Sequence, residues 1–276
     1  MRVDRRDDVL DGRLEAHRER RLGDQLARLW ADDMHADDPL ILPRCDDLRQ
    51  PVHFAQRQRT ARSKRSSRVI YSPMLRRLDH VVFVFRDLQS AIDDYRRRGF
   101  TVTPGGEHAD GITHNALIPF ADGTYVELVG FRDLGRSATH RWWNVAANGG
   151  GLADFALLSD DIAADAAALA ELVKTPPKEG GRITPDGVEL KWRTAVLKPP
   201  LPFIIEDLTP REFRVPSGAA ADHANGAIGI ASVVIGAIDI ADAEWRYAAL
   251  RERGAPHVEV RKAEKDGIMD VRFRSG

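Results

Sequence analysis

Cysteine is almost missing from this sequence of 276 residues, in which Cys45 is the only one. A single cysteine excludes an internal disulfide and any cysteine-rich zinc or iron–sulfur site, and it fits a reducing compartment. The sequence also lacks an uninterrupted apolar run long enough to span a bilayer, and its N-terminal segment lacks the apolar centre of a secretion signal. We therefore expect a soluble, cytoplasmic protein that does not enter a membrane.

Net charge is nearly absent as well, because 41 basic and 42 acidic residues leave a formal charge of −1. Such a balance does not favour binding to nucleic acid or to an anionic membrane. Hydrophobic residues make up 43% of the chain and charged residues 30%. This composition suits one large or two small globular domains with a buried core.

Residues 1–73 differ in composition from everything that follows. They are rich in Arg and Asp, their apolar residues are scattered, and Gln56–Arg68 is a basic, polar run. Apart from one short amphipathic helix, we expect this segment to be disordered. Because the change of composition falls beside Met74, a second expectation is that residues 1–73 are an upstream extension from a wrongly assigned start codon. The folded domain is then 74–276.

A regular pattern begins at Leu78 and predicts the order β-α-β-β-β. Alternating and β-branched apolar runs indicate strands, and an amphipathic stretch that stops at a glycine indicates a helix. The expected elements are a strand over 78–85, a helix over 86–99, and strands over 100–104, 113–120 and 124–131.

The same order recurs further along the chain. A strand and a helix are expected over 152–172, with strands over 187–197 and 201–208, and a shorter echo covers 230–254. Asp154 follows His80 by 74 residues, and Ser232 follows Asp154 by 78. A nearly constant period indicates repeated architecture. The expected units are module one (75–131), a connection (132–150), module two (151–216) and a partial third unit (226–276).

Four polar residues stand inside apolar strands at matching points of the first two units. His80 is followed by Glu127 after 47 residues, and Asp154 by Glu206 after 52. A lone histidine in an apolar strand is more often a satisfied core residue. Four polar groups in paired repeats are better explained as one shared site, because unpaired charges in apolar strands are costly.

Several stretches together resemble one known family: residues 77–108, 113–131, 140–159 and 201–216. They are similar to a glyoxalase-like domain of the vicinal oxygen chelate superfamily, and the resemblance covers 75–273. It implies an α+β fold in which paired βαβββ modules curl their mixed sheets into a cup. The partial third βα unit packs against them or completes a sheet edge. The ligand or metal is expected in the cup.

The resemblance implies metal ligands for this site. His80 matches the family's first-strand His, Glu127 its fourth-strand Glu, and Glu206 the fourth-strand Glu of the second module. Asp154 stands where a second His is common. This set implies a divalent metal (Mn, Mg, Fe, Ni or Zn), and its hard, anionic donors favour Mn, Mg or Fe over Zn. Loss of the metal, as in the antibiotic-binding (bleomycin resistance) members, is the alternative.

Other residues are candidates for substrate binding. His114 and Asn115 lie on alternate faces of one strand, so one of them can face the cup, and Asn115 is preferred. Trp142 or Trp143 could form a wall for an aromatic ligand. Arg193 could hold a carboxylate or phosphate, although a salt bridge at a strand edge explains it equally simply.

The function that the resemblance implies is that of a small-molecule enzyme of the isomerase, lyase or dioxygenase type. Glu127 or Glu206 would move a proton on a substrate with neighbouring oxygens. The alternative is a metal-free protein that binds or sequesters a drug-like ligand. Gly105 and Gly106 precede no helix start, so no nucleotide cofactor is expected. The partner is a small molecule, and monomer and homodimer both fit.

Overall fold

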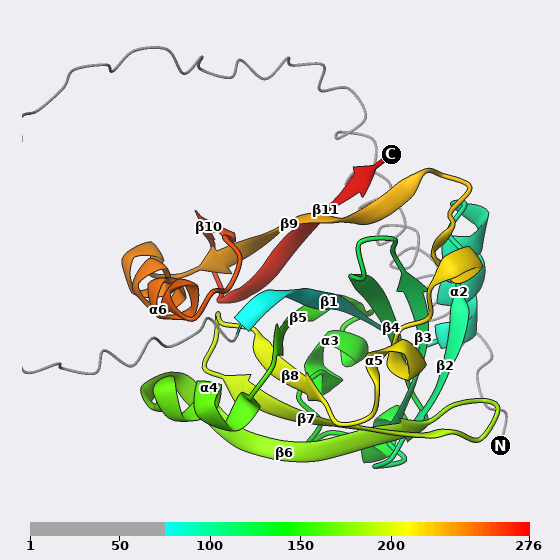
Figure 1. The fold of residues 1–276 in the computed structure, drawn as a ribbon, viewed down its shortest axis with the longest axis horizontal. Helices are drawn as coiled ribbons and strands as arrows, with labels where there is room; N and C mark the ends of the chain where they lie inside the picture. Colours follow the sequence, from blue (N-terminus) through cyan, green and yellow to red (C-terminus); the bar gives the residue numbers. More distant parts are fainter. Residues whose placement is uncertain (1–74) are drawn as a thin grey trace, which may run out of the picture.

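A computed structural model describes residues 75–276 of the chain, and the predictions for residues 1–73 lie outside the described residues. Two β-α-β-β-β modules are followed by a shorter β-α-β-β unit (Figure 1). The α+β fold of paired βαβββ modules with a partial third unit is therefore confirmed.

The elements fall into the three units in chain order. Module one holds β1 (Leu75–Phe85), α2 (Leu88–Arg97), β2 (Thr103–His108), β3 (Thr113–Pro119) and β4 (Tyr125–Phe131). After η2 (Leu134–Arg136) and α3 (Trp143–Ala147), module two holds β5 (Gly151–Ser159), α4 (Ile162–Ala168), η3 (Ala170–Leu172), β6 (Val173–Ile183), β7 (Glu189–Leu197) and β8 (Phe203–Asp207). Next come α5 (Arg211–Arg214), η4 (Gly218–Ala221), β9 (Ala227–Ala237), α6 (Ile240–Glu252), β10 (Glu259–Lys262) and β11 (Gly267–Ser275).

The two modules close into one eight-stranded barrel with the order β1-β4-β3-β2-β6-β7-β8-β5. The first strands of the two modules, β1 and β5, pair antiparallel along most of their length. On the opposite side, β2 and β6 meet over two residue pairs, Glu107 with Ile183 and His108 with Arg182. The predicted cup is thus a closed barrel, and its interior is where side chains from both modules converge.

Alternation along the strands separates an inner from an outer core. Val82 and Val84 of β1 pack inside the barrel with Ala156, Phe203 and other apolar side chains, and α3 covers this cluster. The intervening β1 residues pack outward. Period-two alternation accounts for the separation, and burial on both faces accounts for the nearly continuous apolar sequence of β1.

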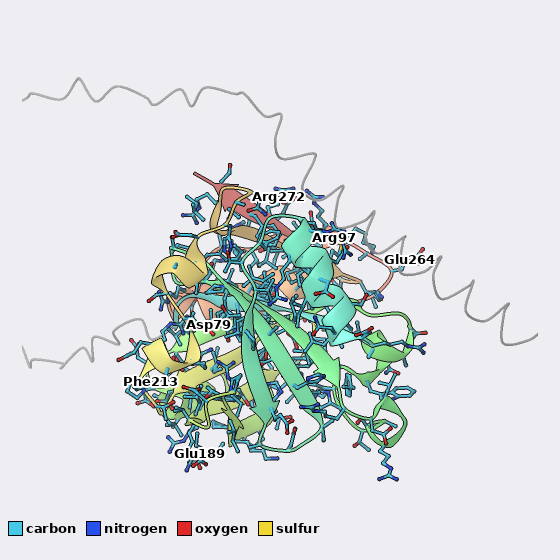
Figure 2. All side chains as sticks on the ribbon, turned by 90° about the vertical axis from the view of Figure 1, so that its right-hand side faces the viewer. Asp79, Arg97, Glu189, Phe213, Glu264 and Arg272 are labelled. Carbon is cyan, nitrogen blue, oxygen red and sulfur yellow. The ribbon has the colours of Figure 1, made fainter. Side chains whose placement is uncertain are left out.

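The third unit forms a separate sheet in the order β10-β9-β11, which lies along the outside of the barrel (Figure 1). Val233 and Ile235 of β9, and Tyr247 of α6, share the outer core with Phe83 of β1. On another side of the barrel, α2 lies across β3 and β4 (Figure 2). No helix in the described range is long and apolar enough to cross a membrane.

Each unit starts its helix with the same cap. The side chains of Asp87, Asp161 and Asp239 accept hydrogen bonds from the backbone three residues later, at the starts of α2, α4 and α6. These aspartates are 74 and 78 residues apart, the offsets that separate the three first strands. The repeat found in the sequence is therefore structural.

The strand β6 is missing from the sequence-based prediction. Its sequence contains Pro176, Pro177, Gly180 and Gly181, which are unusual within a strand. The register of β6 with β7 shifts between Thr175 and Lys178, where the two prolines lie. The prolines are thus accommodated in an irregular part of the pairing.

We expect Asp239→Ala to lower the free energy of unfolding by about 1 kcal/mol, because it removes the N-cap of α6. Asp239→Ser keeps a capping oxygen and should recover most of this loss. Urea unfolding of both variants measures the difference. Equal destabilisation by Ala and Ser would contradict a capping role.

Candidate active site

The barrel contains a cavity of about 510 Å³. Its polar wall includes His80 from β1, Glu127 from β4, Asn115 from β3 and Arg182 from β6. Both modules therefore contribute to it, as closure of the barrel requires. The strand pairing brings β1, β4 and β3 side by side, so three of these residues come from adjacent strands.

His80 is held between two carboxylates. Its Nδ1 lies 2.7 Å from Oδ2 of Asp79, and its Nε2 lies 3.4 Å from Oε2 of Glu127. The ring stacks on Tyr125 with a centroid distance of 4.5 Å, which fixes its orientation. Burial would lower the pKa of His80, but the hydrogen bonds to Asp79 and Glu127 raise it above its usual value. The geometry thus favours the imidazolium, with its Nε2 proton on the side of Glu127.

Asp79 is the residue at which β1 departs from regular pairing. Leu78 and His80 pair with consecutive residues of β5, and Asp79 is skipped. A bulge of this kind redirects side chains, and such bulges are common beside active sites. Here it allows both Asp79 and the adjacent His80 to be buried and hydrogen-bonded to each other.

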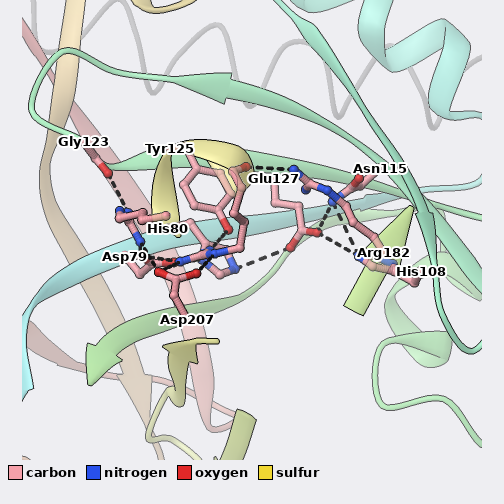
Figure 3. Close-up of polar contacts among 11 residues, drawn as sticks. Asp79, His80, His108, Asn115, Gly123, Tyr125, Glu127, Arg182 and Asp207 are labelled. Carbon is pink, nitrogen blue, oxygen red and sulfur yellow. Dashed lines mark hydrogen bonds and ion pairs between the residues drawn. The ribbon is translucent and has the colours of Figure 1, made fainter. Parts of the chain in front are cut away.

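Two arginines of α5 balance the buried charge of Asp79 (Figure 3). Arg214 Nη1 donates to Asp79 Oδ2 at 2.9 Å and to the Tyr125 hydroxyl at 2.6 Å, and Arg211 forms an ion pair with Asp79 Oδ1. Both arginines also contact Asp207. Although burial would raise the pKa of Asp79, Arg214 and then His80 hold it well below its usual value. Asp79 therefore stays charged behind His80.

Glu127 is surrounded by donors. Asn115 Nδ2 donates to its Oε1 at 2.6 Å, and His108 Nε2 lies 3.4 Å from the same oxygen (Figure 3). Burial would raise the pKa of Glu127, but the hydrogen bonds to His108 and His80 hold it well below its usual value. The cavity wall thus presents a carboxylate next to an imidazolium.

Asn115 is positioned by a glycine on the neighbouring strand. A Cβ built on Gly105 would overlap Oδ1 of Asn115, so β2 approaches β3 this closely because residue 105 has no side chain. That Oδ1 is buried and finds no hydrogen-bond partner among the described residues. Gly105 therefore leaves room for the amide that holds Glu127.

Arg182 reaches the cavity from the opposite module. Its side chain is buried, and Nη2 donates to the backbone carbonyl of Arg214 at 2.8 Å. Its Nε is buried and has no hydrogen-bond partner within residues 75–276. Burial lowers the pKa of the guanidinium, with Tyr125 and Glu127 opposing that effect.

Asp154 lies close to the cavity but is already engaged. Its carboxylate forms an ion pair with Arg141, and it accepts hydrogen bonds from Trp142 Nε1 at 3.2 Å and from the backbone of Phe155 at 2.9 Å. Trp142 lines the cavity, as expected for a wall residue, and Arg141 stacks over its ring.

The strand register separates Glu206 from His80 and Glu127. In module one, Val82 of β1 lies opposite Glu127 of β4. In module two, Ala156, which is 74 residues after Val82, lies opposite Phe203. Phe203 therefore occupies the position equivalent to Glu127, and Glu206 lies three residues further along β8, where an odd step turns its side chain to the other face.

The outward position of Glu206 is consistent with its neighbours. Its carboxylate lies 3.6 Å from Arg193, and it is close to the backbone of Ile162 at the start of α4. Arg193 is 42% exposed and also contacts Glu179, so it forms the strand-edge ion pairs that the sequence left as its alternative reading. Glu206 and Arg193 do not line the cavity.

His114 and Trp143 also lie away from the cavity. The ring of His114 lies on the outer side of β3, beside Gly130 and Leu88 of α2, and the alternate residue Asn115 faces inward. Trp143 Nε1 donates to the carbonyl of Leu134 at 2.8 Å within the connection between the modules.

The four residues predicted as metal ligands do not converge. His80 and Glu127 are adjacent, Asp154 is bound by Arg141 and Trp142, and Glu206 lies outside the barrel. Across residues 75–276, no three His, Cys, Asp or Glu side chains are arranged to hold a metal ion. The predicted ligand set therefore does not fit a metal centre in this arrangement.

Sequence reasoning assigned no role to Asp79 or Arg182, and it treated His108 as a loop residue. Arg211 and Arg214 were considered only as gate or structural residues. A signal for Asp79 did exist, because an acid directly beside His80 in a buried strand needs a partner. Arg182 carried none, since β6 was not recognised as a strand.

The fold and the cavity between the modules define a glyoxalase-like protein. The family model of the glyoxalase-like domain matches residues 78–273. The chain belongs to this family, within the vicinal oxygen chelate superfamily. No curated protein matches the chain significantly in sequence.

Solved structures show the same fold. A hypothetical protein from Staphylococcus aureus is similar with a TM-score of 0.54 and 15% identity, covering 69% of this chain and 87% of that one. A methylmalonyl-CoA epimerase variant from Streptomyces coelicolor has a TM-score of 0.37 and 22% identity, covering 49% and 99%. A Mn(II)-bound glyoxalase from Novosphingobium aromaticivorans has a TM-score of 0.39 and 16% identity, covering 65% and 53%.

We expect Gly105→Ala to destabilise the protein by about 1–3 kcal/mol, because the added methyl group collides with Asn115 Oδ1. Asn115→Ala should remove most of this extra cost, so that the two substitutions are coupled in a double-mutant cycle. Urea unfolding of the single and double variants measures the coupling. Gly135→Ala, where the nearest neighbour of the new Cβ is 3.3 Å away, is the matched control. Additive effects of the two substitutions would contradict this contact.

His80→Gln should cost more stability in acid than in base. The folded-state pKa of His80 lies above its usual value of 6.5. The stability due to protonated His80 is therefore fully present below that value and is lost as pH rises through the folded-state pKa. Urea unfolding from about pH 5.5 to about pH 9 measures the cost, with the exposed His257→Gln as control. A cost that grows with pH would show the opposite sign of the shift.

Proposed function

We propose that this protein is a small-molecule enzyme that moves a proton at a carbon next to a carbonyl group. The observation that carries the proposal is the pair of Glu127 and His80 on the cavity wall, one favoured as carboxylate and the other as imidazolium. A base and an acid 3.4 Å apart can act on two neighbouring atoms of one substrate.

The roles follow from which group holds a proton. The Glu127 carboxylate accepts the proton as the substrate C–H bond breaks, and the electron pair moves to the carbonyl oxygen. His80 donates its Nε2 proton or a hydrogen bond to that oxygen and so stabilises the enolate or enol. Return of the proton to the same or the adjacent carbon gives an epimer or an isomer, and the site is restored.

Asp79, Arg211 and Arg214 are positioning residues in this scheme. Asp79 accepts from Nδ1 of His80, so the exchangeable proton is held on Nε2, beside Glu127. The arginines keep Asp79 charged and fixed. Asn115 sets the position of the Glu127 carboxylate. A resident divalent metal stays a prediction of the family resemblance and supplies no role to these residues.

A ligand-binding protein without catalysis is the second candidate. The aromatic side chains of Trp142, Trp192 and Phe203 line the cavity and favour a flat, apolar ligand. The low pKa of Glu127 also makes its carboxylate a weaker base. Catalysis of proton exchange separates this candidate from the enzyme.

We expect the full chain to catalyse exchange of carbon-bound hydrogen for deuterium in substrates with neighbouring oxygens, such as 2-oxobutanoate and hydroxyacetone. Proton NMR in D₂O measures the rate. Glu127→Gln should reduce it by roughly 10²–10⁴-fold, because the base is removed with little change in shape. Glu189→Gln, an exposed carboxylate on β7, is the matched control. No exchange by the wild type, or undiminished exchange by Glu127→Gln, would contradict the enzyme.

A further inference from the structure

Arg182 differs from the other arginines around the cavity in lacking a carboxylate partner. Arg141, Arg211 and Arg214 each form an ion pair with an aspartate. Within the described range, no Asp or Glu side chain forms one with Arg182, whose contact through Nη2 is with a backbone carbonyl. A buried guanidinium without a counterion is costly.

The free donor of Arg182 belongs to a residue of the cavity wall. The side chain is 3% exposed and lines the cavity, and its Nε is buried without a hydrogen-bond partner among residues 75–276. A buried unsatisfied donor in a native protein needs an explanation. A ligand oxygen at this position would satisfy the donor and neutralise the charge together.

We propose that the cavity selects substrates that carry a carboxylate, and that Arg182 binds this carboxylate. The Nε and a neighbouring Nη of a guanidinium match the two oxygens of a carboxylate, which makes the contact bidentate. The proposal rests on the proposed function for the chemistry that follows binding, but it concerns recognition alone.

A carboxylate fits the local charges better than a phosphate does. Glu127 is close enough to Arg182 to influence its charge, so the position already feels one negative group. A singly charged, planar ligand adds less repulsion than a dianion would. The rest of the ligand would lie against Trp142, Trp192 and Phe203, which line the same cavity.

Arg182 also lies on the correct side of the proton-transfer pair. Figure 3 shows Glu127 between His80 on one side and Arg182 with His108 on the other. A carboxylate on Arg182 therefore brings the adjacent carbon atoms of the substrate toward Glu127 and His80. Arg182 is thus a substrate-binding residue that sets which molecules reach the base.

The experiment compares benzoylformate with benzoylformamide, which differ by a carboxylate and an uncharged amide. Calorimetric titration of the wild-type chain should show benzoylformate binding at least about tenfold more tightly, since a charge-assisted hydrogen bond is lost in the amide. Arg182→Gln should remove this preference. Arg182→Lys keeps the charge but not the planar fork, and it should retain part of the preference. Arg261→Gln on β10 is the matched control and should behave as wild type.

Two results would overturn the proposal. One is equal binding of the two compounds by the wild type, or no binding of benzoylformate at millimolar concentration. The other is a folded Arg182→Gln or Arg182→Lys variant with the full wild-type preference. If Arg182→Gln does not fold, the wild-type comparison and Arg182→Lys decide.

The proposed function can fail independently. Arg182-dependent binding of benzoylformate, together with no deuterium exchange in 2-oxobutanoate, supports carboxylate recognition and refutes the enzyme. Exchange that is as fast in 2-oxobutanamide as in 2-oxobutanoate, and insensitive to Arg182→Gln, supports the enzyme and refutes carboxylate recognition.

Discussion

The charge of Asp79 is the constraint on which the site depends. A fully buried carboxylate is tolerated only when charged or polar groups surround it, and here two arginines and a histidine do so. Each of these contacts also fixes its partner. His80 is oriented toward Glu127, and α5 is held against the barrel by Arg211 and Arg214. The bulge in β1 places Asp79 where all of these contacts can form. Local backbone irregularity and buried charge are therefore two parts of one arrangement.

Closure of the barrel makes the cavity a property of both modules. Module one supplies His80, Asn115 and Glu127 from adjacent strands, and module two supplies Arg182 from the far side. In module two the position equivalent to Glu127 is Phe203, so the two halves of the interior are chemically different. One half carries the proton-transfer groups, and the other supplies aromatic surface and a cation. A repeated fold with unequal halves suits a substrate that has one polar end.

The fold was predictable from the sequence because the repeat leaves a periodic trace. First strands and helix caps recur at offsets of 74 and 78 residues, and alternation placed Asn115 rather than His114 inside. The site was less predictable because it depends on register and on strand irregularity. Glu206 lies in an apolar strand like Glu127, but a step of three residues from Phe203 places it on the other face. Arg182 follows two prolines and two glycines, a composition that hides the strand carrying it. Asp79 acquires its role through a bulge, which period-two reasoning does not represent.

The low pKa of Glu127 places a condition on its use as a base. In the protein alone, His108, His80 and Asn115 stabilise the carboxylate, and a carboxylate stabilised in this way accepts a proton reluctantly. A second negative group nearby acts in the opposite direction, because like charges disfavour the ionised form. A substrate carboxylate held by Arg182 would supply such a charge next to Glu127, while filling the cavity and removing water. The group that anchors the substrate would then also raise the basicity of Glu127. Recognition and proton transfer would be coupled through one electrostatic interaction, and uncharged molecules in the same cavity would meet a weaker base.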